Sequence, residues 1–140
     1  MYQEVASVLG LRRGKRSGSL DIARSIEKGF PSSSIDRLKQ DLGITDRLLS
    51  TLIGRTAKTV GRMRAERSRL SPIVSDRLFR IARVYVLAIE VFEDPTAARE
   101  WLQSPQIGLN NRTPLDLLAT EAGAQAVKDL LTRIEYGVIS

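Results

Sequence analysis

A helix-capping residue followed directly by proline occurs three times in the sequence, and it is the feature that most restricts the fold. The three pairs are Ser71-Pro72, Asp94-Pro95 and Thr113-Pro114. A Ser, Thr or Asp side chain accepts hydrogen bonds from the free amides at a helix start, and proline suits the first helical position because its missing amide would stay unpaired there. No segment alternates apolar and polar residues as a strand would. The sequence therefore predicts an all-α fold.

Further caps and glycine stops divide the chain into short helices. Glycine commonly ends a helix because it adopts a positive φ at little steric cost. The expected helices lie between Ser19 and Gly29, over 34–42, 46–53, 57–67, 72–93 and 95–102, over a short segment after Pro114, and between Thr120 and Gly137. Residues 105–112 (PQIGLNNR) are expected to form a loop.

Charge is distributed unevenly along the chain. The 140 residues carry a net charge of +6, which divides into +8 over residues 1–93 (18 Lys and Arg, 10 Asp and Glu) and −2 over residues 94–140 (4 and 6). A basic excess favours an acidic partner, nucleic acid first. We expect three parts: a mobile basic arm over 1–18, a DNA-binding and dimerisation domain over 19–93, and a protein-binding domain over 94–140. The arm is either a solvated tail or a contact to DNA phosphates.

The chain contains no His and no Cys. This composition excludes an imidazole base, a thiolate nucleophile and the usual His or Cys ligands of a metal. We therefore expect no enzyme activity, no catalytic residue, no cofactor and no metal site. A hydrolase or transferase that relies on carboxylates is the least favoured alternative.

Neither a secretory signal nor a membrane span is expected. The apolar run at the N-terminus precedes the basic cluster, the reverse of a secretory signal. The longest apolar run, residues 84–92, is about half the length of a spanning helix and contains Glu90. We expect a soluble, cytoplasmic protein with no membrane partner.

Residues 45–66 have the pattern of a helix-turn-helix. A helix of about eight residues meets a turn at Gly54, and Thr56 then caps a second helix. The start of this second helix offers free amides and a partial positive charge to phosphate, and its basic side chains can reach guanine or phosphate. The candidate DNA-binding residues are Arg55, Thr56, Lys58, Thr59 and Arg62. The alternative is a surface helix of an ordinary bundle with solvated charges. Gly61 either permits close approach to DNA or has no role.

The helix predicted over residues 72–93 is apolar nearly all round in its second half. Such a helix is buried, either as the central core helix or within a dimer interface, and the two are compatible. A homodimer would suit a helix-turn-helix protein, because two recognition helices can read a two-fold operator.

Residues 94–138 resemble the toxin-binding domain of the Xre/MbcA/ParS antitoxin family. The segments that carry this resemblance are Trp101-Leu102, the run from Leu109 to Leu115 (LNNRTPL), the following Leu-Leu pair, Thr120 with Gly123, and the run from Arg133 to Val138 (RIEYGV). Residues 30–93 resemble the Xre-like helix-turn-helix region of the family more loosely. In the loop, where the family commonly has Gly, this chain has Asn110-Asn111-Arg112. Asn tolerates a positive φ, so the turn is expected to survive.

The resemblance implies an antitoxin that binds a RES-domain toxin, blocks the active site with which this toxin consumes NAD, and represses its own operon by binding operator DNA. It places the toxin contacts at Asn110, Arg112, Arg133, Tyr136, Val138, Ile139 and Ser140. The alternative function is a stand-alone Xre-type repressor whose C-terminal domain dimerises or senses a ligand.

Overall fold

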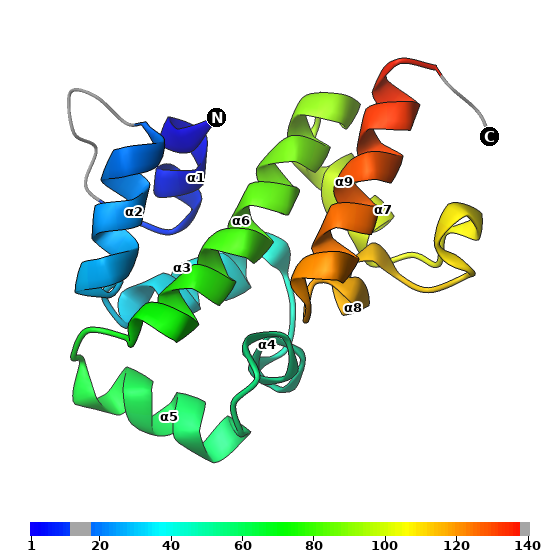
Figure 1. Cartoon of the computed structure of the whole chain (residues 1–140). Helices are drawn as coiled ribbons and strands as arrows, with labels where there is room; N and C mark the ends of the chain where they lie inside the picture. Colours follow the sequence, from blue (N-terminus) through cyan, green and yellow to red (C-terminus); the bar gives the residue numbers. More distant parts are fainter. Residues whose placement is uncertain (12–17, 138–140) are drawn as a thin grey trace.

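The computed structural model describes residues 1–11 and 18–137, and over these residues the chain is helical without strands (Figure 1). The elements are α1 (Tyr2–Val8), α2 (Ser19–Lys28), α3 (Ser33–Leu42), α4 (Asp46–Ile53), α5 (Ala57–Glu66), α6 (Pro72–Phe92), α7 (Pro95–Leu102), the 3-10 turn η1 (Ile107–Leu109), α8 (Pro114–Leu117) and α9 (Glu121–Glu135). The predicted all-α fold is confirmed.

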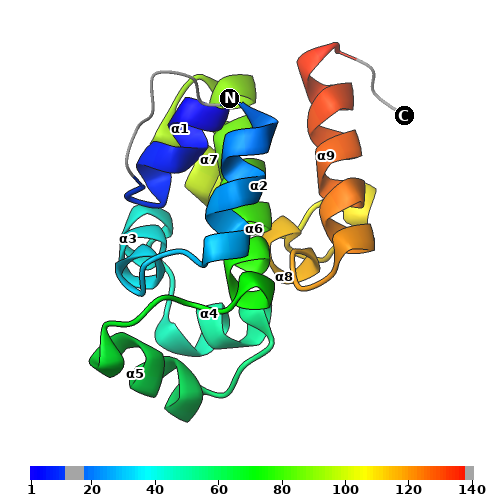
Figure 2. The same cartoon turned by 60° about the vertical axis from the view of Figure 1, so that its left-hand side comes forward.

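Helix α6 runs through the middle of the molecule, and α1 to α4, α7 and α9 all pack around it (Figures 1 and 2). One cluster of buried apolar side chains extends from Val5 in α1 to Leu131 in α9. The expected core role of this helix is confirmed. The buried residues of α6 are Val74, Ser75, Leu78, Ile81, Ala82, Val84, Tyr85, Val86 and Ala88.

All three capping residues that precede a proline cap a helix. The Ser71 hydroxyl accepts from the Val74 amide at 3.2 Å, and the Thr113 hydroxyl accepts from the Asp116 amide at 3.2 Å. The Asp94 carboxylate accepts from two amides of α7, at 3.3 and 3.2 Å. The positions of these helix starts are therefore confirmed. Helix α3 begins one residue earlier than expected, at Ser33. Its N-cap residue is Ser32, whose side chain makes no capping hydrogen bond.

The structure describes residues 1–11 of the predicted mobile arm, and for these residues the prediction is wrong. Residues 2–8 form α1, and Val5 and Leu9 are fully buried beside α6. The buried Ser34 hydroxyl donates to the Leu9 carbonyl at 2.7 Å, which fixes the end of α1 on α3. The apolar residues of this segment share one helix face, a pattern that the neighbouring basic cluster obscured. That cluster, residues 12–16, lies outside the described residues.

Residues 105–112 form a loop that contains η1, closed by a bridge between Gln106 and Arg112. In the part of the chain that the structure describes, no helix is long and apolar enough to cross a membrane.

Candidate DNA-binding and toxin-binding surfaces

The turn between α4 and α5 has the geometry of a helix-turn-helix. Gly54 ends α4 with φ of 68°, and the Thr56 hydroxyl caps α5 by accepting from the Thr59 amide at 3.1 Å. The Arg77 guanidinium of α6 donates to the Ile53 carbonyl at 2.8 Å and so satisfies the end of α4. Leu49, Ile53 and Val60 are buried between the helices.

A small ionic network joins α3, α4 and α5. The Arg64 guanidinium lies 2.6 Å from the Asp36 carboxylate and 3.0 Å from the Asp46 carboxylate. The Lys39 ammonium is also 3.0 Å from Asp46. The hydrogen bond from Lys39, helped by the charge of Arg64, lowers the pKa of Asp46 below its ordinary value of 3.8. Arg64 therefore holds the three helices together rather than facing a ligand.

Arg55 and Thr56 lie in the turn before α5, Lys58 and Thr59 lie in its first turn, and Arg62 lies near its middle. Thr56 and Lys58 are exposed, and the Arg62 side chain is 67% exposed, with a long 4.0 Å contact to Glu66. Arg55 is half-buried and donates to the Gly54 carbonyl at 3.1 Å. Thr59 is half-buried, and its hydroxyl accepts from that of Thr56 at 2.9 Å. Lys58 and Arg62 are thus the freest side chains of this set to meet DNA.

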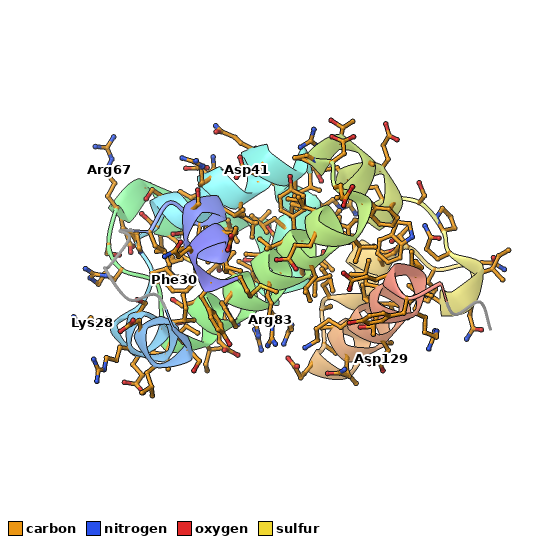
Figure 3. All side chains as sticks on the ribbon, turned by 90° about the horizontal axis from the view of Figure 1, so that it is seen from above. Lys28, Phe30, Asp41, Arg67, Arg83 and Asp129 are labelled. Atoms are coloured by element: carbon orange, nitrogen blue, oxygen red, sulfur yellow. The ribbon has the colours of Figure 1, made fainter. Side chains whose placement is uncertain are left out.

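The other basic residues between positions 67 and 83 do not form one surface. Arg69 donates to the Gly29 carbonyl at 2.8 Å, and Arg80 donates to the Leu118 and Ala119 carbonyls at 3.0 Å each. Figure 3 shows Arg67 and Arg83 on opposite sides of the molecule, and Arg83 lines a groove between α6 and α9. The excess of positive charge in the sequence therefore overstates the charge available to DNA.

The described part of the candidate toxin surface comprises the 105–112 loop and the end of α9. Asn110 and Asn111 adopt φ of 56° and 62°, so the expected tolerance of Asn for this turn is confirmed. Arg112 is exposed, and Tyr136 is 74% exposed just past α9. Arg133 is half-buried, and its Nε finds no hydrogen-bond partner among the described residues. Val138, Ile139 and Ser140 lie outside the described residues.

The sequence did not predict one highly exposed side chain of this surface. Ile107, at the start of η1, is 90% exposed. A single isoleucine in a loop rich in Gly and Asn belongs to no periodic pattern, so only the three-dimensional structure singles it out.

Comparisons with known proteins match both halves of the chain. Residues 21–83 match the family model of the antitoxin Xre-like helix-turn-helix domain. Residues 87–137 match that of the antitoxin Xre/MbcA/ParS C-terminal toxin-binding domain. The two matches meet within α6.

Individual relatives agree with the family models. An antitoxin Xre of Yersinia enterocolitica is 35% identical over 117 residues, covering 83% of this chain and 79% of that protein. The Prs ADP-ribosylating antitoxin of a Sphingobium species is 24% identical over 134 residues, covering 89% and 84%. The crystal structure of the M. tuberculosis MbcT-MbcA toxin-antitoxin complex contains a similar chain, with TM-score 0.59 and 25% identity over 78% of this chain and 96% of that one.

A helix-turn-helix joined to a toxin-binding domain defines an antitoxin that also carries a DNA-binding unit. The chain belongs to the Xre antitoxin family.

Proposed function

We propose that this chain neutralises a RES-domain toxin that consumes NAD, by covering the active site of that toxin, and that it represses its own operon. The observation that carries the proposal is the match of residues 87–137 to a toxin-binding domain, whose last helix ends in the exposed Tyr136. The structure of a related antitoxin in complex with its toxin supports a protein partner. The RES class of the toxin rests on the resemblance of residues 94–138 to the family.

Occlusion needs an exposed element that can enter the mouth of an active site. We assign this role to Tyr136 with Val138, Ile139 and Ser140, and place supporting polar contacts at Asn110, Arg112 and Arg133. The Arg133 side chain is half-buried, and its buried Nε has no hydrogen-bond partner among the described residues. We propose that the exposed part of this side chain contacts the toxin.

Operator binding is assigned to the start of α5. The exposed Lys58 lies in the first turn of the helix, where the amides not used by the Thr56 cap can meet phosphate, and the exposed Arg62 follows one turn later. Arg62 is proposed to read a base, while Lys58, Arg55, Thr56 and Thr59 contact phosphates or orient the helix.

Two chains are proposed to act as a homodimer on a two-fold operator in the cytoplasm, without catalytic activity of their own. The start of α5 and the end of α9 lie at opposite ends of the molecule (Figure 1). DNA and the toxin can therefore bind to one chain at the same time.

Deletion of residues 136–140 tests the proposal. We expect the shortened chain to lose protection against NAD consumption by the purified toxin and to keep operator affinity. Arg62→Ala is the matched control, with toxin neutralisation kept and sequence preference on DNA relaxed. A full-length chain that binds its operator but no toxin would instead indicate the alternative, a stand-alone repressor.

A further inference from the structure

Ile107 is the most exposed large apolar side chain in the described part of the chain, at 90%. Burial of an isoleucine side chain stabilises a protein by about 1.5–3 kcal/mol, and the unbound chain lacks this contribution while Ile107 is exposed. Single exposed apolar residues are common on protein surfaces, so exposure alone carries no meaning. The way in which the chain holds Ile107 is more informative.

The loop that presents Ile107 is fixed by its own hydrogen bonds. The Gln106 amide donates to the Arg112 carbonyl at 3.1 Å, and the Asn111 amide donates to the Gln106 carbonyl at 2.9 Å. The Gln106 side-chain amide donates to the carbonyls of Trp101 and Ser104, both at 3.1 Å. The two ends of the turn are thus tied to each other, and Gln106 is tied to the end of α7.

The turn is also packed closely against α9. Leu109 is buried, and a Cβ placed on Gly108 would lie 3.1 Å from a methyl group of Leu130. The backbone on the C-terminal side of Ile107 is therefore anchored, while the Ile107 side chain itself faces solvent. Holding an apolar group in a fixed position before binding lowers the entropic cost of association.

Helix α9, against which the turn packs, carries exposed apolar side chains of its own. Ile134, which is 39% exposed, lies one helical turn beyond Leu130 on the same face. Tyr136 follows at the end of the helix, and Arg133, with its unpartnered Nε, lies three residues beyond Leu130. Aliphatic and aromatic side chains next to an arginine are a composition typical of the centre of a protein interface.

We propose that Ile107 is the anchor of the toxin interface, and that it inserts into an apolar socket on the surface of the toxin with Ile134 at its edge. The occupant is the toxin rather than a second copy of this chain, because both residues lie within the 87–137 match to a toxin-binding domain. The inference rests on the proposed function and deepens it. It moves the centre of affinity from the C-terminal tail to the 105–112 loop.

The test measures the affinity of the unmodified chain for a purified cognate RES-domain toxin. We expect Ile107→Asp to raise the Kd about 30-fold or more, the size of effect that defines an interface anchor, while Ile107→Val stays within about 3-fold. Leu20→Asp on α2 is the matched control, because Leu20 is 72% exposed and lies outside 87–137. This control is expected to bind as the unmodified chain does.

Two further measurements complete the test. Thermal unfolding should be the same for Ile107→Asp and Leu20→Asp, so that a loss of affinity reports the interface. Ile107→Ala combined with Ile134→Ala should show non-additive losses, because the two residues would share one socket.

Unchanged affinity of Ile107→Asp, with tight binding by the unmodified chain, overturns the anchor and leaves the proposed function standing. If the unmodified chain does not bind the toxin at all, the proposed function fails and the anchor fails with it.

Discussion

Two helical glycines illustrate how the surroundings decide the role of a residue. A Cβ placed on Gly61 in α5 meets no atom within 4 Å, whereas a Cβ on Gly123 in α9 would collide with the Leu117 carbonyl oxygen. Gly123 is therefore required for α8 to pack against the first turn of α9. Gly61 has no such steric reason within the described part of this chain.

Gly61→Ala should stabilise the free protein by about 0.5–1 kcal/mol, because alanine loses less backbone entropy than glycine in a helix. Urea denaturation measures the change. Gly123→Ala is the contrasting variant and should lose about 1–3 kcal/mol or more through overpacking. A destabilised Gly61→Ala would contradict this account.

The operator affinity of the same Gly61→Ala protein separates the two interpretations of this residue. Reduced affinity in a stabilised protein means that the missing Cβ lets the backbone of α5 approach DNA closely. Unchanged affinity means that Gly61 has no role in binding.

At the scale of elements, arginines of α6 fasten the ends of other helices. The Arg80 side chain is 13% exposed, reaches two carbonyls at the end of α8, and lies 3.8 Å from Glu121 at the start of α9. Arg77 does the same for the end of α4. Both arginines belong to the basic excess of residues 1–93, and both make their hydrogen bonds within the protein.

Arg80→Met should destabilise the fold by about 1–3 kcal/mol, because methionine keeps part of the apolar stem but leaves two carbonyls without their charged donor. Arg80→Lys should recover little of the loss, since an ammonium lacks the planar fork that reaches both carbonyls. Arg47→Met, at an exposed position of α4, is the control and should change stability by less than about 0.5 kcal/mol. Equal midpoints of urea denaturation for Arg80→Met and Arg47→Met would refute the role of Arg80.

The sequence predicted those elements whose signals are local. Ser71, Asp94 and Thr113 cap their helices as expected, and Gly54 ends α4 with a positive φ, because capping depends on residues within one turn. The sequence did not predict helix α1, because its short apolar face adjoins a basic cluster and only contacts with α6, which is distant in sequence, show that this face is buried. The same limit applied to Ile107, Arg77 and Arg80, whose surroundings are created only by the packing of separate segments.

At the scale of the whole molecule, the candidate DNA-binding surface is small. Arg55, Lys58 and Arg62 supply its positive charge, and a dimer would present these three residues twice. Because each neutralised phosphate contributes about 0.9 to the slope of log K against log salt, contacts from these residues alone predict a slope of about 5 in magnitude. A steeper slope would indicate further phosphate contacts, such as contacts from the basic residues 12–16.

Operator affinity measured between about 50 and 200 mM salt tests this expectation. Lys58→Ala should reduce the slope without changing sequence preference, whereas Arg62→Ala should relax the preference at one base position. An affinity independent of salt would contradict binding through this surface.

The continuous burial of α6 restricts how the DNA-binding and toxin-binding halves of related antitoxins can be recombined. The two family matches, residues 21–83 and 87–137, meet inside a helix whose side chains form the core of both halves. A chimera that joins the DNA-binding half of one relative to the toxin-binding half of another would need matching side chains along the whole length of α6. New toxin specificities are therefore easier to reach by changing a few exposed positions, such as 107 and 134, than by recombining halves.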